Sequence, residues 1–143
     1  MRWAEIQENG GIAVVTGGAS GVGLAAAQQL AARGFDLFLV DMIAGALATA
    51  AQALRDTGAK VDTEVVDVSD ANAMLSLADQ AFSKGDIAVL MNNAGLGMPS
   101  STLEAPEVWR TNFDVNFFGI LNGVQAFVPR MIEAGRAAAV SYT

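Results

Sequence analysis

The sequence contains no cysteine and no histidine. Without cysteine the chain forms no disulfide and offers no thiolate nucleophile, and zinc sites built on Cys or His are excluded. A Ser-His-Asp triad is excluded as well, because it needs an imidazole as the base. We therefore expect no metal site, and any chemistry here depends on other residues.

Positive charge is also scarce, with 8 Lys and Arg residues against 15 Asp and Glu and a formal net charge of −7. A chain this acidic repels phosphate backbones, so we expect no nucleic-acid partner. Residues 1–11 include Glu5 and Glu8 and lack the apolar core of a secretory signal. No apolar run is long enough to span a membrane, so we expect a cytoplasmic protein without a membrane partner.

The composition fits one globular domain over residues 1–143, since 52% of the chain is hydrophobic. Short apolar runs alternate with segments of helical periodicity. The expected strands are 12–16, 35–40, 61–66, 87–91 and 137–142, and the expected helices are 21–33, 43–57, 70–82 and 106–132. This alternation predicts an α/β fold, a Rossmann-like doubly wound parallel sheet of about five strands with helices on both faces. The strands read as continuously apolar, as a sheet covered on both faces requires. A piece of a (β/α) barrel is the alternative.

A glycine-rich loop joins the first strand to the first of these helices. A helix N-terminus there would offer free N–H groups and a partial positive charge to a pyrophosphate. We expect Gly17 to form the tight turn, Gly21 to allow close approach of phosphate, and Gly23 to let the helix pack on the strand. An ordinary turn is the simpler interpretation, but the position between strand and helix favours a binding loop. The predicted binding residues of the loop are Thr16, Gly17, Ser20, Gly21, Val22 and Gly23.

Asp41 follows the second strand and is followed by Met42. A carboxylate at this place can accept hydrogen bonds from the adenosine ribose hydroxyls and would repel a 2′-phosphate. Neither Ser20 nor Met42 is an Arg or Lys that could hold such a phosphate. The sequence therefore favours NAD as the cofactor over NADP, and both Asp41 and Met42 are predicted to contact it. The simpler interpretation is a polar residue that ends a strand.

With these features placed, nearly the whole chain resembles the N-terminal part of the short-chain dehydrogenase/reductase family. The motifs that carry the resemblance, in order, are Thr16-Gly17-x-x-x-Gly21-x-Gly23, Asp67-Val68, Asn92-Asn93-Ala94-Gly95, and Trp109 followed by Val115-Asn116. The resemblance implies an NAD-dependent oxidoreductase that transfers hydride between NAD and a small-molecule alcohol or ketone. This chain would supply the cofactor-binding half of that enzyme.

The resemblance also implies roles for the later motifs. Asn93, Ala94 and Gly95 would line the ribose side of the cofactor and brace the first strand through Thr16. Asp67 and Val68 would flank the adenine, and Asn116 would support a catalytic lysine through water. Simpler interpretations stay open: residues 93–95 as a turn, Asp67 as a helix cap, and Asn116 as a buried polar group bonded to backbone.

The sequence departs from the family's pattern at the catalytic residues, which in the family are Ser, Tyr and Lys. Its one tyrosine is Tyr142, and neither lysine, Lys60 or Lys84, follows a tyrosine at the required spacing. Ser141 and Thr143 lie near the expected serine, and neither is assigned as catalytic. Three interpretations follow: part of a longer dehydrogenase reading frame, which we favour, a short NAD-binding protein without catalysis, or a chain completed by a second one. A nucleoside-binding methyltransferase is disfavoured, because no acidic residue lies among the glycines.

The predicted helix 106–132 carries apolar residues on more than one side, among them Phe113, Phe117 and Phe118. Such a helix needs cover on several sides, so we expect a homo-oligomer that forms through it, or a marginally stable chain. We expect Pro129 to kink or end the helix. The fifth strand should be an open sheet edge, and Trp3 should pack on the surface without a functional role.

Overall fold

The computed structural model describes residues 3–142 and contains one five-stranded sheet whose paired strands are all parallel. The strand order is β3-β2-β1-β4-β5. The strands are β1 (Ile12–Thr16), β2 (Asp36–Asp41), β3 (Val61–Val65), β4 (Ile87–Asn92) and β5 (Ala139–Tyr142). This order confirms the doubly wound Rossmann-like fold, because the chain moves from β1 toward β3 and then returns to the other side of β1.

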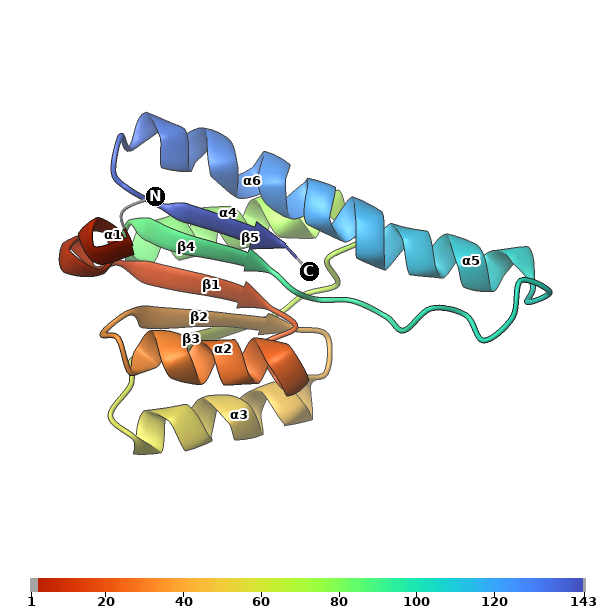
Figure 1. Cartoon of the computed structure of the whole chain (residues 1–143), viewed down its shortest axis with the longest axis horizontal. Helices are drawn as coiled ribbons and strands as arrows, with labels where there is room; N and C mark the ends of the chain where they lie inside the picture. Colours follow the sequence, from red (N-terminus) through yellow and green to blue (C-terminus); the bar gives the residue numbers. More distant parts are fainter. Residues whose placement is uncertain (1–2, 143) are drawn as a thin grey trace.

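Helices cover the sheet on both faces (Figure 1). They are α1 (Trp3–Asn9), α2 (Gly21–Ala31), α3 (Ala44–Asp56), α4 (Ala71–Lys84), α5 (Pro106–Phe113), the π-helical turn η1 (Asp114–Phe118) and α6 (Gly119–Glu133). Ala13 and Val15 of β1 pack in the core with α2 and α3, whereas Val14 packs in the core with α4 and α6. Within residues 3–142, no helix is both long and apolar enough to cross a membrane.

The central strands β1, β2 and β4 are almost fully buried, as their apolar sequences predict. The expectation that the strands are continuously apolar and covered on both faces is wrong for β3, whereas β5 is the open edge that was expected. In β3 only Val61 is buried, and the strand carries Asp62 and Glu64. In β5 only Ala139 is buried. The physical reason is position, because an edge strand has a sheet neighbour on one side only, and charged residues on β3 discourage further pairing.

The long helix predicted over 106–132 consists of three consecutive pieces, since η1 interrupts it between α5 and α6. Pro129 lies inside α6, which continues to Glu133, so Pro129 does not end the helix, and the kink stays a prediction. A proline removes the backbone donor that would bond to the preceding turn, so the turn after it can stay helical, and Met131 in that turn is buried. The π-helical turn coincides with Asn116, one of the predicted site residues.

The amino-terminal segment forms a short helix, α1, that the sequence analysis did not assign. Its Ile6 is fully buried in the core, and the Trp3 ring packs on Phe35 with the ring centroids 6.0 Å apart. Arg136, in the turn before β5, forms an ion pair with Asp86 and donates a 2.8 Å hydrogen bond to the carbonyl of Asn9. These contacts join three loops at the amino ends of the strands, the end opposite the glycine-rich loop.

Candidate functional site

A cleft of about 400 Å³ lies at the carboxyl ends of the strands. It forms where the loops after β1 and β4 leave the sheet in different directions, the place where doubly wound folds bind ligands. Residues from the loops after β1, β2, β3 and β4 line it, joined by Val115 of η1. They are Gly17, Ser20, Gly21, Val22, Asp41, Met42, Ile43, Val66, Asp67, Val68, Asn93, Ala94, Gly95, Leu96 and Val115. All predicted cofactor-binding residues line the cleft except Thr16 and Gly23.

Three glycines shape the loop after β1. Gly17 has φ +65°, and a Cβ there would lie 2.9 Å from the Cα of Ala94. Gly21 has φ +53°, and a Cβ there would meet no atom within 4 Å. A methyl group on Gly23 would overlap the carbonyl oxygen of Gly17 and reach to 2.5 Å from Nδ2 of Asn93. The loop therefore needs Gly17 and Gly23 for its own packing, whereas Gly21 leaves open space.

The N-terminus of α2 adjoins this open space. Ser20 precedes the helix in extended conformation, and its side chain does not cap the helix amides. The first N–H groups of a helix need acceptors, and an anion supplies them well. This end of α2 therefore fits a diphosphate, which would approach at Gly21 where no side chain stands in the way.

Thr16 and Asn93 connect the loops after β1 and β4. Oγ1 of Thr16 accepts hydrogen bonds from the amides of Asn93 at 2.9 Å and Ala94 at 3.0 Å. Nδ2 of Asn93 donates to the carbonyls of Thr16 at 3.1 Å and Gly17 at 3.3 Å. These bonds fix the two sides of the cleft relative to each other. They give the bracing expected of Thr16, so residues 93–95 do more than end a strand.

We expect the Thr16→Val variant to unfold about 2 kcal/mol more easily than the unmodified chain, because two amides then lack their acceptor near the core. Thermal or urea unfolding measures this difference. Thr49→Val is the matched control, since Oγ1 of Thr49 bonds only to the carbonyl of Gly45 on the exposed side of α3. Equal stability of the Thr16 and Thr49 variants would show that the bracing contributes nothing.

Asp41 lies at the end of β2 with its carboxylate held in place by two backbone amides. Oδ2 accepts from the amide of Ala19 at 3.2 Å, and Oδ1 accepts from the amide of Ile43 at 3.1 Å. Each oxygen keeps a further acceptor position, so the carboxylate can still accept from two ligand hydroxyls. The lining of the cleft contains no lysine and no arginine, so its charge comes from Asp41 and Asp67.

The loop after β3 forms another side of the cleft. Val66 and Val68 are buried, whereas Asp67 is exposed. Oδ1 of Asp67 accepts from the amide of Ser69 at 2.9 Å and from its hydroxyl at 2.7 Å. Asp70, and not Asp67, caps α4 by accepting from the amides of residues 72 and 73. The simpler interpretation of Asp67 as the helix cap is therefore wrong, and the carboxylate instead orders the turn.

Asn116 is fully engaged with the loop after β4. Its Oδ1 accepts from the amide of Leu96 at 2.7 Å, and its Nδ2 donates to the carbonyl of Leu96 at 2.8 Å. Nδ2 also contacts Oδ1 of Asn112 at 3.1 Å, and Asn112 in turn donates to the carbonyl of Gly97 at 2.8 Å. The structure thus has the backbone pairing that the simpler interpretation predicts. Support of a lysine through water stays a prediction.

Two further asparagines on the same helical run, Asn112 and Asn122, are both buried and were not predicted as site residues. Asn112 anchors the loop after β4, and Asn122 bonds to the loop after β3. The sequence feature that could have identified them is their residue type. A buried amide in an otherwise apolar helix needs a partner, and Asn112 and Asn116 are spaced to share one helix face.

The described residues place no Tyr-Lys pair beside the cleft. Tyr142 and Ser141 are exposed at the end of β5, and Thr143 lies outside the described residues. Both lysines lie toward the amino ends of the strands. Lys60 pairs with Asp36 at 2.7 Å, which raises the pKa of that lysine, and Lys84 pairs with Asp62 at 3.4 Å.

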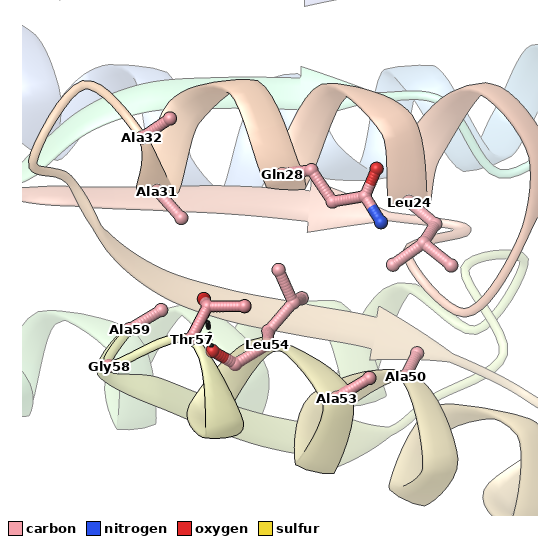
Figure 2. A pocket seen from close by; sticks show the side chains of 10 residues that line it. All are labelled: Leu24, Gln28, Ala31, Ala32, Ala50, Ala53, Leu54, Thr57, Gly58 and Ala59. Carbon is pink, nitrogen blue, oxygen red and sulfur yellow. Dashed lines mark hydrogen bonds between the residues drawn. The ribbon is translucent and has the colours of Figure 1, made fainter.

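A second hollow, of about 500 Å³, lies between α2 and α3 (Figure 2). Half of the residues in its walls are alanine, with Leu24 and Leu54 pointing into it and Gln28 at one side. The hydroxyl of Thr57 is already donated to the carbonyl of Leu54 at 2.7 Å. No charged side chain lines this hollow. Although it is larger than the cleft at the carboxyl ends of the strands, it offers fewer groups that could bind a polar ligand.

Comparison with known proteins agrees with this geometry. The sequence pattern of a family described as short chain dehydrogenase matches residues 11–142. A 1-deoxy-11-beta-hydroxypentalenate dehydrogenase from Streptomyces avermitilis is 41% identical over an alignment of 129 residues, and the match covers 87% of this chain and 47% of that protein. The chain spans about half the length of the curated relatives it matches.

Solved structures are similar over the same region. A short-chain dehydrogenase/reductase from Burkholderia phymatum in complex with NAD superposes with a TM-score of 0.90 at 37% identity, covering 93% of this chain and 48% of that one. A metagenomic short-chain oxidoreductase in complex with NADP superposes with a TM-score of 0.86 at 28% identity, covering 92% of this chain and 60% of that one. Both dinucleotides therefore occur among the structural neighbours.

Proposed function

This chain belongs to the short-chain dehydrogenase family, and on this premise we propose that it binds NAD in preference to NADP in the cleft at the carboxyl ends of its strands. The observation that carries the proposal is Asp41, a carboxylate fixed by two amides at the edge of a cleft that no lysine or arginine lines. Such a site accepts bonds from ribose hydroxyls and opposes a second negative charge.

Each part of the cleft has a proposed role toward the dinucleotide. The N-terminus of α2 binds the pyrophosphate, with Gly21 leaving room for it and the amides of Ser20 and Val22 nearby. Asp41 accepts from the adenosine ribose, with Met42 beside it. Asp67 and Val68 flank the adenine, and the residues from Asn93 to Gly95 line the second ribose.

For the whole protein we propose an oxidoreductase that transfers hydride between NAD and a small-molecule alcohol or ketone in the cytoplasm. When bound, the cofactor would accept hydride from an alcohol as NAD, or donate hydride to a ketone as NADH. This chain contributes the binding half, and Asn116 holds the loop that carries Leu96 beside the cleft. The alternative is a non-catalytic NAD-binding module, favoured by the position of both lysines at the far end of the sheet. A Tyr-x-x-x-Lys motif in sequence that follows Thr143 would support the enzymatic function over the non-catalytic one.

The direct test is a titration of the purified chain with NADH and with NADPH, followed by cofactor fluorescence or calorimetry. We expect saturable binding of NADH that is about tenfold tighter than binding of NADPH, because the extra phosphate places a second negative charge beside Asp41. Equal or tighter binding of NADPH would contradict the proposed preference. A folded chain that binds neither cofactor would contradict the function.

We also propose that the chain forms a homo-oligomer through residues 106–132. Phe113, Phe117 and Phe118 are each roughly half exposed on this run, with exposed fractions of 56%, 58% and 46%. Large aromatic surfaces of this kind are more often covered by a partner than left in water. We expect the Phe117→Glu variant to shift the mass measured by light scattering toward the monomer. Val65→Glu, at the opposite sheet edge, is the control, and an unchanged mass for Phe117→Glu would contradict the proposal.

A further inference from the structure

Asn122 on α6 is buried, with an exposed fraction of 9%, and it does not line the cleft. Its Nδ2 donates to the carbonyl of Val68 at 2.9 Å and to the carbonyl of Ser69 at 3.2 Å. The sequence separation is more than fifty residues, so the bonds join two distant parts of the fold. A buried amide costs free energy unless it is paired, which makes these two carbonyls the partners that Asn122 requires.

Gly119, one turn earlier on α6, lies against the side chain of Val68. A Cβ on Gly119 would lie 2.6 Å from Cγ2 of Val68. Real Cβ atoms essentially never approach so closely, so the helix can reach Val68 only because residue 119 is glycine. Asn122 thus holds the backbone of Val68, while Gly119 allows α6 to pack against its side chain.

Val68 needs such support because it lies beyond the end of the sheet ladder. β3 ends at Val65, and the last backbone bond to β2 runs from the amide of Val66 to the carbonyl of Asp41 at 3.2 Å. The turn at Asp67 is closed by bonds from the amide and hydroxyl of Ser69 to its carboxylate and from the amide of Asp70 to its carbonyl at 3.1 Å. All of these bonds are local and do not connect the turn to the rest of the fold. The bonds from Asn122 make that connection.

We propose that Asn122 and Gly119 are positioning residues that set the depth of Val68 and thereby shape the side of the cleft that receives the adenine. The inference rests on the proposed function, because it assumes that adenine occupies the part of the cleft lined by residues 66–68. Asn122 touches no part of the ligand in this account and acts through Val68. The arrangement requires a donor at position 122, since both of its partners are carbonyl oxygens.

The experiment compares the affinity for 5′-AMP and for NADH between the unmodified chain and two variants, Asn122→Leu and Asn122→Asp. The leucine removes the donor, and the aspartate keeps the shape but turns an acceptor toward two carbonyls. We expect both variants to lose 5′-AMP affinity by about fivefold or more, with the larger loss for Asn122→Asp. Val61→Ala is the control, because it weakens the core at the amino end of β3, away from the cleft.

A purely structural role predicts that affinity follows thermal stability, so Val61→Ala and Asn122→Leu would then bind 5′-AMP alike at equal loss of melting temperature. That result, or unchanged 5′-AMP affinity in both Asn122 variants, would overturn the inference. Gly119→Ala supplies the answer if the Asn122 variants do not fold, since it displaces Val68 and keeps the donor. Its 5′-AMP affinity should fall, and unchanged affinity would overturn the inference. An unmodified chain that binds neither 5′-AMP nor NADH would refute the proposed function itself.

Discussion

The Gly23→Ala variant should lose measurable NADH binding and unfold about 2 kcal/mol more easily than the unmodified chain, as expected for an overpacked site. The added methyl group would overlap the carbonyl oxygen of Gly17 and crowd the amide of Asn93. Either the start of α2 or the loop after β1 must then move. Both movements displace the helix amides from the place where we propose that they bind the pyrophosphate.

Gly45→Ala is the matched control for this variant. Gly45 lies in the first turn of α3, and a Cβ there meets no atom within 4 Å. Alanine at a helical position is more favourable than glycine by roughly 0.5–1 kcal/mol, so the control should be at least as stable as the unmodified chain and bind NADH equally. Undiminished NADH binding by Gly23→Ala would show that the loop does not hold the cofactor.

The Asp41→Ala variant should reverse the cofactor preference. NADH affinity should fall about tenfold, because the ribose hydroxyls lose a charged acceptor. NADPH affinity should rise for two reasons. The repulsive charge is removed, and the amides of Ala19 and Ile43, which the carboxylate now occupies, become available to the 2′-phosphate. Titrations with both reduced cofactors measure the ratio of the two affinities.

Asp41→Asn separates these two causes. The amide has the same shape as the carboxylate and lacks its charge, so it removes the repulsion and still fills the space beside the two backbone amides. We expect Asp41→Asn to bind NADPH more weakly than Asp41→Ala does. If neither variant binds NADPH better than the unmodified chain, Asp41 does not determine the preference and the proposed orientation of the adenosine is wrong.

Much of the fold could be predicted because its elements are encoded locally. β1 and β4 are short apolar runs, Asp70 is a capping residue at the start of a periodic helix, and Gly17 and Gly23 mark a turn and a close contact. The exposure of β3 was predicted wrongly although its sequence carried a signal, since Asp62 and Glu64 are charged residues that suit an edge strand.

The candidate site, like the fold, was predictable from the sequence only in part. The residues that line the cleft follow strand ends, so their sequence position places them together once the parallel sheet is assumed. Asn112 and Asn122 were missed because their partners, Gly97 and Val68, are brought to them by tertiary structure alone. For Asn116, the sequence singled out the residue, and the structure supplied its bonds to Leu96.

The most direct test of NAD binding at the carboxyl ends of the strands is an NMR titration of the ¹⁵N-labelled chain with NADH. We predict saturable shifts for the amides that face the cleft, at Gly17, Gly21, Val22, Val68 and Gly95, and none for the hollow between α2 and α3. Shifts confined to that hollow, or a folded chain whose spectrum does not change at all, would contradict the account.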